Sequence, residues 1–370
     1  MNQRASKILV FRIGSLGDTI VALPAFEEIR RQHPTSKITL LSNRDLSNPE
    51  RVFAAQVVEN NGIFDDYLAY PSNAAGTKLS KELIKLTLEI RSRKYDLLYY
   101  LPPRVRTLSQ QKRDKLFFRL CGIKAFLGFE SYKNRFLDLE TTPKYVSVEK
   151  EADFLLSCIE GSLKGKADDS ASTTFGETPD AIPKISLSNE EIRQAVERIK
   201  YSGVKEGSLL IAVCPGAKWQ SKIWPIENYI FVIRALITDF DITPLIFGDR
   251  TEREIGERLI KDLGRGVNYA GCLTIRESAS VISKTTLYLG NDTGTMHLAA
   301  AVGVPCVAVF ASIDWVGRWH PAGIGHTVFR TKVDCEVCML SECPFDNLCM
   351  KKIDAESVLQ ACRERLSGLR

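Results

Sequence analysis

The sequence predicts an α/β protein made of two doubly wound halves, each with a parallel sheet. Short, nearly continuous apolar runs recur along the 370-residue chain, and a polar loop and an amphipathic segment follow most of them. Such runs are typical of central strands in parallel sheets, and the strand–loop–helix order is typical of β/α units. One stretch rich in Gly, Ser, Thr and Asp separates the two series. We therefore expect an N-terminal domain over residues 1–180 with a linker at about 161–183, a second domain over 184–350, and a C-terminal helix over 351–370 that packs back on the first domain.

The composition indicates an ordinary soluble globular protein. Hydrophobic residues make up 44% of the chain and charged residues 26%. No apolar run approaches the roughly 20 residues needed to span a bilayer, and the polar start, Met1 to Lys7, does not resemble a secretory signal. We therefore expect a cytoplasmic protein whose ten cysteines remain thiols. The net charge of +5 is too mild to demand nucleic acid as a partner.

The first predicted strand, Ile8 to Ile13, runs into a loop that can hold a ligand. Gly14, Ser15 and Gly17 let the backbone turn sharply and leave space near the start of the following helix. The spacing is not that of the G-x-G-x-x-G dinucleotide fingerprint, which argues against a dehydrogenase. Asp18 has two interpretations: a carboxylate that caps the helix, or one that takes a proton from an attacking hydroxyl. By itself, the loop favours the cap.

A basic segment follows the predicted strand Tyr95 to Leu101. Between residues 104 and 135 the chain has nine Lys or Arg and two acids. The segment is either a solvated helix face or a site for an anionic partner, and we favour the site. The aromatic residues in this segment have the spacing of core residues rather than of stacking platforms for bases, which disfavours nucleic acid. The cations nearest to the strand end are Arg104, Arg106, Lys112 and Arg113.

In the second half, three loops follow predicted strands and should meet at one edge of the sheet. The loop after Leu209 to Cys214 carries Lys218 and Lys222, and the loop after Thr243 to Phe247 carries Glu252. Ligands of open α/β sheets bind beyond the carboxyl ends of the strands. The lysines are either phosphate-binding cations or surface charges whose stems pack on a nearby Trp ring.

The third loop belongs to the strand–loop–helix–strand unit from Leu287 to Phe310. Asp292 and Thr293 either cap a buried helix or belong to a binding loop. In the second case, the amides of Gly294, Thr295 and Met296 point out of a helix N-terminus, where an anion is favoured. A cation, a carboxylate and a helix N-terminus together suit a nucleotide-sugar.

The tail contains four cysteines in the order C-x2-C-x4-C-x5-C. Zinc is conceivable, but the pattern has no second C-x-x-C and no histidine at a suitable spacing, so we favour buried thiols over a metal site. We therefore predict no metal and no cofactor. The cysteines are Cys335, Cys338, Cys343 and Cys349.

Three blocks of the sequence resemble family 9 glycosyltransferases, the heptosyltransferases of lipopolysaccharide core synthesis. They are FRIGSLGDTIVALPAFEEIRRQHPTSKITLL, CPGAKWQSKIWPIENY and GNDTGTMHLAAAVGVPCVAVF. The resemblance implies a GT-B architecture, in which two Rossmann-like domains face each other across a cleft, the first binding the acceptor and the second the donor. It also implies transfer of a heptose from ADP-heptose, with inversion at the anomeric carbon and without a catalytic metal.

The same resemblance implies roles for particular residues. Asp18 matches the family's proposed general base, Lys222 the lysine at the donor phosphates, and Asp292 the aspartate that holds the sugar. Glu252 is similar to the acidic residue near the nucleotide ribose, although Asp249 replaces a glycine often found in that loop. The phosphate-binding turn is matched by Thr293, Gly294, Thr295, Met296 and His297.

We therefore expect an inverting glycosyltransferase that acts on an anionic, lipid-linked glycan such as the lipopolysaccharide core. Such an acceptor implies peripheral contact with the cytoplasmic face of the inner membrane. One alternative is a nucleotide-sugar epimerase of the same architecture. Another is a non-catalytic carbohydrate-binding protein that keeps the fold, although the presence of both Asp18 and Lys222 argues against it.

Overall fold

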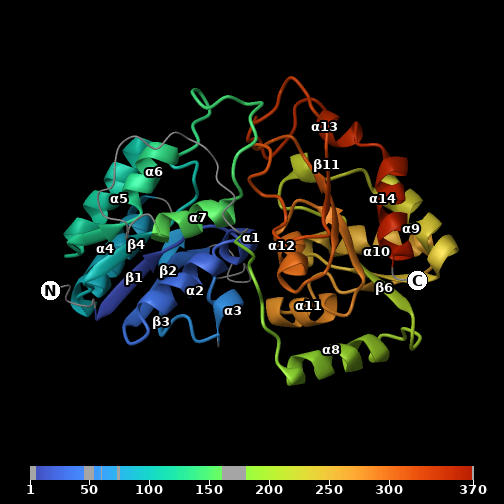
Figure 1. The fold of residues 1–370 in the computed structure, drawn as a ribbon, viewed down its shortest axis with the longest axis horizontal. Helices are drawn as coiled ribbons and strands as arrows, with labels where there is room; N and C mark the ends of the chain where they lie inside the picture. Colours follow the sequence, from blue (N-terminus) through green and yellow to red (C-terminus); the bar gives the residue numbers. More distant parts are fainter. Residues whose placement is uncertain (1–5, 46–53, 60, 73–75, 161–180, 369–370) are drawn as a thin grey trace. The chain divides into compact units, whose positions relative to one another are not determined.

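The structure, a computed structural model, describes residues 6–45, 54–59, 61–72, 76–160 and 181–368. The chain divides into two compact units, each with its own parallel sheet (Figure 1). Unit 1 comprises residues 1–142 and 151–183, and unit 2 comprises residues 143–150 and 184–370. This confirms the predicted α/β class with two parallel-sheet halves.

Unit 1 is built on a five-stranded sheet in the order β3-β2-β1-β4-β5, with every pairing parallel. Its strands are β1 (Lys7–Phe11), β2 (Lys37–Asp45), β3 (Asp66–Ser72), β4 (Leu97–Tyr100) and β5 (Ala125–Leu127). Its helices are α1 (Leu16–Ile20), α2 (Leu23–Gln32), α3 (Ala55–Val58), α4 (Gly76–Arg93), α5 (Leu108–Leu120), α6 (Phe129–Arg135) and α7 (Glu151–Glu160).

The helix predicted after β1 is divided into two. Helix α1 ends at Ile20, and α2 begins at Leu23 with Pro24 in its first turn. Proline lacks an N–H group, so it is tolerated where helical N–H groups have no partner, at the start of a helix. The short α1 therefore stays next to the Gly14 to Asp18 loop, while α2 packs against α7.

Unit 2 is built on a six-stranded parallel sheet in the order β11-β10-β9-β6-β7-β8. Its strands are β6 (Leu209–Cys214), β7 (Ile242–Ile246), β8 (Val267–Asn268), β9 (Leu287–Asn291), β10 (Cys306–Phe310) and β11 (Thr327–Arg330). Its α-helices are α8 (Asn189–Tyr201), α9 (Ile226–Phe240), α10 (Arg253–Leu263), α11 (Ile275–Ile282), α12 (Gly294–Ala301), α13 (Leu348–Lys351) and α14 (Ala355–Ser367), with short 3-10 turns η1 (Gln220–Lys222) and η2 (Arg250–Glu252).

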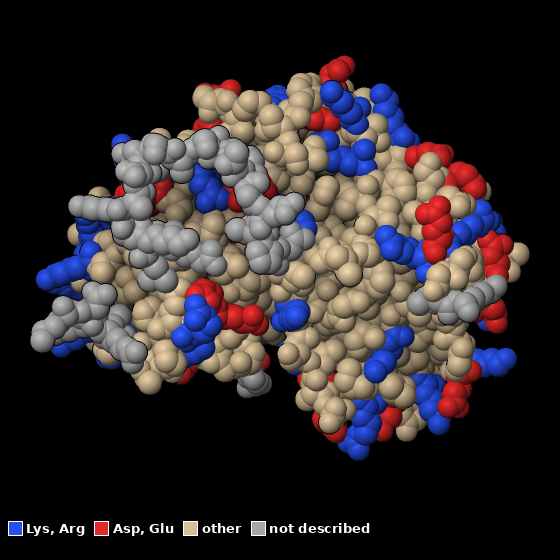
Figure 2. Space-filling model, viewed as in Figure 1, with Lys and Arg blue, Asp and Glu red and all other residues tan. Residues whose placement is uncertain are grey.

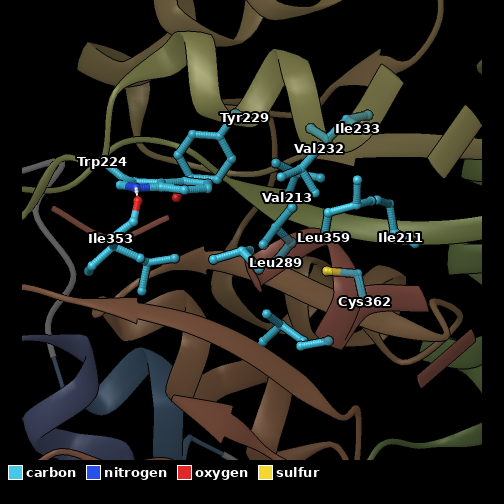
Figure 3. Packing of buried hydrophobic residues seen from close by; sticks show 14 of the residues in the cluster. Ile211, Val213, Trp224, Tyr229, Val232, Ile233, Leu289, Ile353, Leu359 and Cys362 are labelled. Carbon is cyan, nitrogen blue, oxygen red and sulfur yellow. Dashed lines mark hydrogen bonds between the residues drawn. The ribbon is translucent and has the colours of Figure 1, made fainter. Parts of the chain in front are cut away.

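The core of unit 2 lies between the sheet and helices α9 and α14. Figure 3 shows Ile211 and Val213 of β6 and Leu289 of β9 beneath α9, with Leu359 and Cys362 of α14 packed on the same cluster. The buried indole of Trp224 lies at one end of the cluster and donates a hydrogen bond to the carbonyl of Ile353 at 3.3 Å. This contact ties the loop after β6 to the segment that leads into α14.

The C-terminal helix corrects one expectation. It was expected to pack on the first domain, but α14 packs against α9, β9 and β10 of unit 2 (Figure 1). The reason is apolar burial, because Val358, Leu359 and Cys362 are at most 1% exposed within the unit 2 core.

The domain boundary also differs from the single break that we expected. Residues 143–150 belong to unit 2, and the chain returns to unit 1 with α7. Residues 161–180 of the predicted linker lie outside the described residues. Among the helices of the described residues, none is long and apolar enough to cross a membrane.

Candidate active site

The candidate donor site of unit 2 begins where two neighbouring strands end. In the sheet, Cys214 at the end of β6 pairs with Gly290 in β9, so the loops that follow these strands start side by side. Parallel strands bring their carboxyl ends to one edge, and this edge carries Lys222 on one loop and Asp292 on the other.

Asn291 holds these two loops together. Its side chain is fully buried and uses both polar atoms: Nδ2 donates to the carbonyls of Pro215 (2.8 Å) and Gly216 (3.1 Å). Its Oδ1 accepts from the hydroxyl of Tyr229 (2.9 Å) and the N–H of Trp224 (3.2 Å). We did not assign Asn291 from sequence; an amide at the end of an otherwise apolar strand was the available signal, since buried polar groups need partners.

Lys222 and Asp292 form a close ion pair, with Nζ 2.6 Å from Oδ2. The lysine side chain is 21% exposed and the aspartate 7%, so the ammonium group remains reachable while the carboxylate is nearly enclosed. The ammonium group also lies 5.7 Å from the centre of the Trp219 ring. The lysine therefore lies beside a Trp, as one interpretation expected, while phosphate binding by its ammonium group stays a prediction.

The start of α12 presents N–H groups next to this pair. Within the described chain, no acceptor faces the N–H groups of Gly294 and Thr295. The amide of Met296 was expected to be a third free donor, but it donates to the carbonyl of Thr293 at 3.1 Å. The first turn of α12 is tight, so this amide is used inside the helix. Two amides rather than three remain for an anion.

Other residues of the predicted turn have supporting positions. The hydroxyl of Thr293 lies 3.4 Å from the hydroxyl of Tyr288 and 3.7 Å from the sulfur of Cys214, which fixes its orientation. The side chains of Met296 and His297 are buried beneath the turn. Neither side chain is open to solvent, so we expect both to shape the turn from below.

Glu252 lies between the loops that follow β6 and β7. Its Oε2 accepts a hydrogen bond from the N–H of Asp249 at 2.8 Å. A Cβ atom on Gly216 would lie 2.4 Å from Oε1, and one on Gly248 would lie 2.6 Å from Oε2. The carboxyl therefore fits only because two glycines face it. Burial, with a smaller contribution from the negative charge of Asp249, raises the pKa of Glu252 to about 7.

The tail with four cysteines supports the loop that carries Lys222. The N–H of Ser221 donates to the carbonyl of Ser341 at 3.0 Å, and Nδ2 of Asn347 donates to the carbonyl of Gln220 at 2.9 Å. Cys349 is buried in the core of unit 2. Across the described residues, no group of three or more His, Cys, Asp or Glu side chains is arranged to hold a metal ion. Lys218, in the same loop as Lys222, is exposed.

In unit 1, Asp18 both caps α1 and keeps a partly open carboxylate. Its Oδ2 accepts from the N–H (2.8 Å) and the hydroxyl (2.9 Å) of Ser15, as the capping interpretation predicted. Its side chain is nevertheless 18% exposed, and Oδ1 lies 3.5 Å from Nη2 of Arg12. Gly14 has a φ of +148°, and a Cβ there would lie 2.2 Å from Cβ of Asp18, so only glycine fits. Gly17 is buried in α1.

Arg12 is a residue that the sequence analysis missed. It lies just beyond β1, is 1% exposed, and donates to the carbonyls of Asp18 and Leu101, each at 3.0 Å. Its guanidinium also lies 3.7 Å from the buried carboxylate of Glu151. A charged residue within an apolar run was the signal, because a buried charge requires a partner.

The structure divides the four cations expected to bind the acceptor into two kinds. Arg106 forms a two-point ion pair with the buried Asp114, and Arg104 is 7% exposed, donates to the carbonyl of Arg135 and lies over the ring of Phe154. These two arginines stabilise unit 1 from within, so we no longer assign them to acceptor binding. Lys112 and Arg113 are exposed on α5 and remain candidates.

Comparison with known proteins finds a family that matches part of the chain. The model of glycosyltransferase family 9 (heptosyltransferase) matches residues 171–349. The chain is 23% identical to lipooligosaccharide heptosyltransferase 2 of Haemophilus ducreyi over 81% of each chain, and 23% identical to lipopolysaccharide heptosyltransferase 2 of Escherichia coli K12 over 82% of each. It is 32% identical to lipooligosaccharide heptosyltransferase 2 of Haemophilus influenzae over 35% of this chain and 41% of that one.

Solved structures share the fold. A family 9 glycosyl transferase from Veillonella parvula superposes with a TM-score of 0.71 at 20% identity, covering 98% of each chain. ADP-heptose lps heptosyltransferase II of E. coli gives 0.68 at 18% identity over 98% of this chain and 99% of that one. An E. coli heptosyltransferase solved with ADP gives 0.62 at 15% identity over 97% and 99%. The chain therefore has the GT-B fold with two Rossmann-like domains and is a glycosyltransferase whose residues 171–349 match family 9, the heptosyltransferase family.

Proposed function

We propose that this glycosyltransferase transfers a heptose from ADP-heptose to a lipopolysaccharide core or related cell-surface glycan, with inversion at the anomeric carbon. The observation that carries the proposal is the strand end of unit 2. There, a reachable ammonium group and an enclosed carboxylate adjoin two N–H groups that no acceptor among the described residues faces. This set of groups suits a diphosphate attached to a polyol.

The ion pair of Lys222 and Asp292 would act as a holder for the donor. Without donor, the ammonium group of Lys222 and the carboxylate of Asp292 neutralise each other, with Nζ 2.6 Å from Oδ2. A diphosphate carries more negative charge than one carboxylate, so it can attract the ammonium group, and the carboxylate of Asp292 can then accept hydrogen bonds from sugar hydroxyls. During transfer, charge grows on the departing diphosphate, and each prepositioned donor is worth roughly 10²–10³-fold in rate.

The adenosine half of the donor would extend toward Glu252. Its carboxyl lies beside the loop after β6, so it is within the same unit and at the same sheet edge as Lys222. An ionised carboxylate accepts hydrogen bonds from both hydroxyls of a ribose. The related heptosyltransferase solved with ADP supports adenine nucleotide as the donor carrier.

Asp18 would serve as the general base of a single displacement. The oxygen of an acceptor hydroxyl forms a bond to the anomeric carbon while the bond from that carbon to the diphosphate oxygen breaks. The hydroxyl proton passes to the carboxylate of Asp18, and ADP leaves with the bonding electron pair. Ser15 and Arg12 orient this carboxylate, and its 18% exposure leaves an oxygen reachable for an acceptor.

The acceptor would be an anionic, lipid-linked glycan. Lys112 and Arg113 are exposed on α5, where they can attract phosphate or carboxylate groups of such a glycan. A lipid-linked acceptor also implies peripheral contact with the cytoplasmic face of the inner membrane. Binding of the acceptor should weaken as salt is raised, because exposed charges are screened beyond about 10 Å at 0.1 M salt.

A transfer assay tests the proposal and separates it from its alternatives. The protein is incubated with ADP-heptose, with and without an anionic core acceptor, and both ADP release and the anomeric configuration of the product are measured. We expect ADP release that depends on acceptor, together with an inverted product. Conversion of the donor without acceptor would instead indicate an epimerase, and binding of ADP-heptose without turnover on any core acceptor would indicate a non-catalytic protein.

A further inference from the structure

The outward faces of α4 and α5 in unit 1 carry large apolar side chains that remain exposed. We call these two faces together the α4–α5 surface. Most large apolar residues in the described part of the chain are buried, and exposed ones on neighbouring elements mark an interaction site. The exposed fractions are 60% for Ile84, 63% for Leu88, 59% for Leu116 and 60% for Leu120.

On α4, the exposed residues lie away from the core for a geometric reason. Leu86 and Ile90 are at most 4% exposed and face the unit 1 core. Ile84 and Leu88 are one helical turn apart and lie on the opposite side of the helix. Rotating α4 to bury Ile84 and Leu88 would expose Leu86 and Ile90, so Ile84 and Leu88 remain in solvent.

The same pattern recurs on α5, which contacts α4. Phe118 is 1% exposed on the inner side, whereas Leu116 and Leu120, again one turn apart, face outward. The guanidinium of Arg91 in α4 donates to the carbonyl of Leu120 at 3.3 Å, which joins the ends of the two helices. The four exposed apolar side chains therefore lie on two neighbouring helices, with Leu88 and Leu120 near their joined ends.

This surface is strongly basic. Helices α4 and α5 together contain nine Lys or Arg and three Asp or Glu, a balance of +6, while the whole chain has a net charge of +5. All three acids are paired: Glu82 with Lys85, Glu89 with Arg93, and Asp114 with Arg106. Figure 2 shows Lys and Arg side chains along the edge of unit 1 where α4 and α5 lie in Figure 1. The exposed cations of the two helices are Lys78, Lys81, Lys85, Arg91, Lys112, Arg113 and Arg119.

We propose that the α4–α5 surface docks on a bilayer of anionic phospholipid. Its aliphatic side chains would enter the boundary between headgroups and acyl chains, while the surrounding Lys and Arg remain at the level of the lipid phosphates. Apolar insertion and electrostatic attraction are the two signals that stable peripheral binding needs. The inference deepens the proposed membrane contact, but it concerns binding that requires neither donor nor acceptor.

Charge argues for lipid over a second copy of this chain. A two-fold interface would set the same patch against itself, so two surfaces of +6 would face each other. Like charges placed across an interface oppose association. An anionic bilayer offers the opposite charge at its surface and an apolar interior for the four aliphatic side chains.

Co-sedimentation with vesicles tests the proposal on the full chain. Wild-type protein should bind vesicles of phosphatidylglycerol and phosphatidylethanolamine and should bind phosphatidylcholine vesicles only weakly. In high salt, its binding to the anionic vesicles should fall to the level seen with phosphatidylcholine. The double variant Leu88→Ser/Leu120→Ser should lose at least about tenfold in binding, because two apolar side chains no longer enter the bilayer. The double variant Lys81→Gln/Arg119→Gln should lose about 25-fold, at about fivefold for each charge near an anionic surface.

The control replaces one exposed apolar residue and one exposed cation of unit 2. Ile324 is 95% exposed and Lys200 is exposed on α8, so Ile324→Ser/Lys200→Gln should bind like wild type. Melting curves check that every variant is folded. The proposal is wrong if wild type ignores anionic vesicles, or if both α4–α5 variants bind them as wild type does. It is also wrong if sedimentation shows a wild-type dimer that Leu88→Ser/Leu120→Ser dissolves. Transfer to a soluble acceptor without lipid tests the proposed function separately.

Discussion

Replacing Glu252 with glutamine should make the protein more stable at neutral and higher pH while changing little at acidic pH. The carboxyl is enclosed by Gly216, Gly248 and the N–H of Asp249, and its pKa is raised from 4.5 to about 7. Between these values, the folded protein keeps a proton that the unfolded chain releases. The stabilisation from this group is therefore complete below pH 4.5 and is lost as the pH rises through about 7.

The size of the effect follows from the two pKa values. Each pH unit between 4.5 and about 7 corresponds to about 1.4 kcal/mol, so ionising Glu252 in the folded protein costs about 3 kcal/mol. Glutamine has a similar shape, can still accept from the N–H of Asp249, and cannot ionise. The free energy of unfolding of Glu252→Gln relative to wild type should therefore rise by about 3 kcal/mol between about pH 4.5 and about pH 8.

Urea unfolding at several pH values measures this difference directly. Glu254→Gln is the matched control, since Glu254 is a neighbouring exposed acid in the first turn of α10. The free energy of unfolding of Glu254→Gln relative to wild type should not rise between about pH 4.5 and about pH 8. If Glu252→Gln and wild type differ by the same amount at all pH values, Glu252 does not titrate in this range and the reasoning from its burial fails.

Three further substitutions test the site. Asp18→Asn should fold and bind ADP-heptose but lose about 100-fold or more in transfer rate, because the amide cannot take the proton; wild-type turnover in this variant would remove the base assignment. Lys222→Ala should weaken ADP binding about tenfold or more, as measured by calorimetry, because the phosphates lose a charge-assisted partner; unchanged affinity would contradict the donor-site assignment. Asn291→Ala should lower the free energy of unfolding by about 3 kcal/mol in urea, because four buried hydrogen bonds lose their partner, and a change near zero would show that the loops hold each other by other contacts.

The strand ends of unit 2 were predictable because each carries its own local signal. The apolar runs predicted Leu209–Cys214 with the bounds that β6 has, and the unit from Leu287 to Phe310 starts with β9 and ends with β10. Sequence position then placed Lys222 and Asp292 on loops at one edge of the sheet. Their direct ion pair could not be predicted, because the two residues are 70 positions apart and their distance depends on how the loops fold.

The basic segment of unit 1 shows where the sequence misleads. A count of charges treats its cations as one surface, yet Arg106 is neutralised by Asp114 eight residues later and Arg104 is buried. Arg104 and Arg106 lie in the loop before α5, where their contacts with Phe154 and Asp114 largely bury them, whereas Lys112 and Arg113 follow within the helix and face solvent. The four exposed apolar residues on α4 and α5 were missed because apolar residues in amphipathic helices are ordinarily assigned to the core.

Apolar periodicity and short motifs are local properties of a chain, so two α/β units, the loops at their strand ends and the resemblance to family 9 glycosyltransferases could be predicted from the sequence. Three features emerge only when the chain is folded: Asn291 joins two loops, Glu252 lies against two glycines, and the last helix completes unit 2. Each of these depends on which distant side chains share the same buried space, and burial sets both the pairing of polar groups and their pKa values.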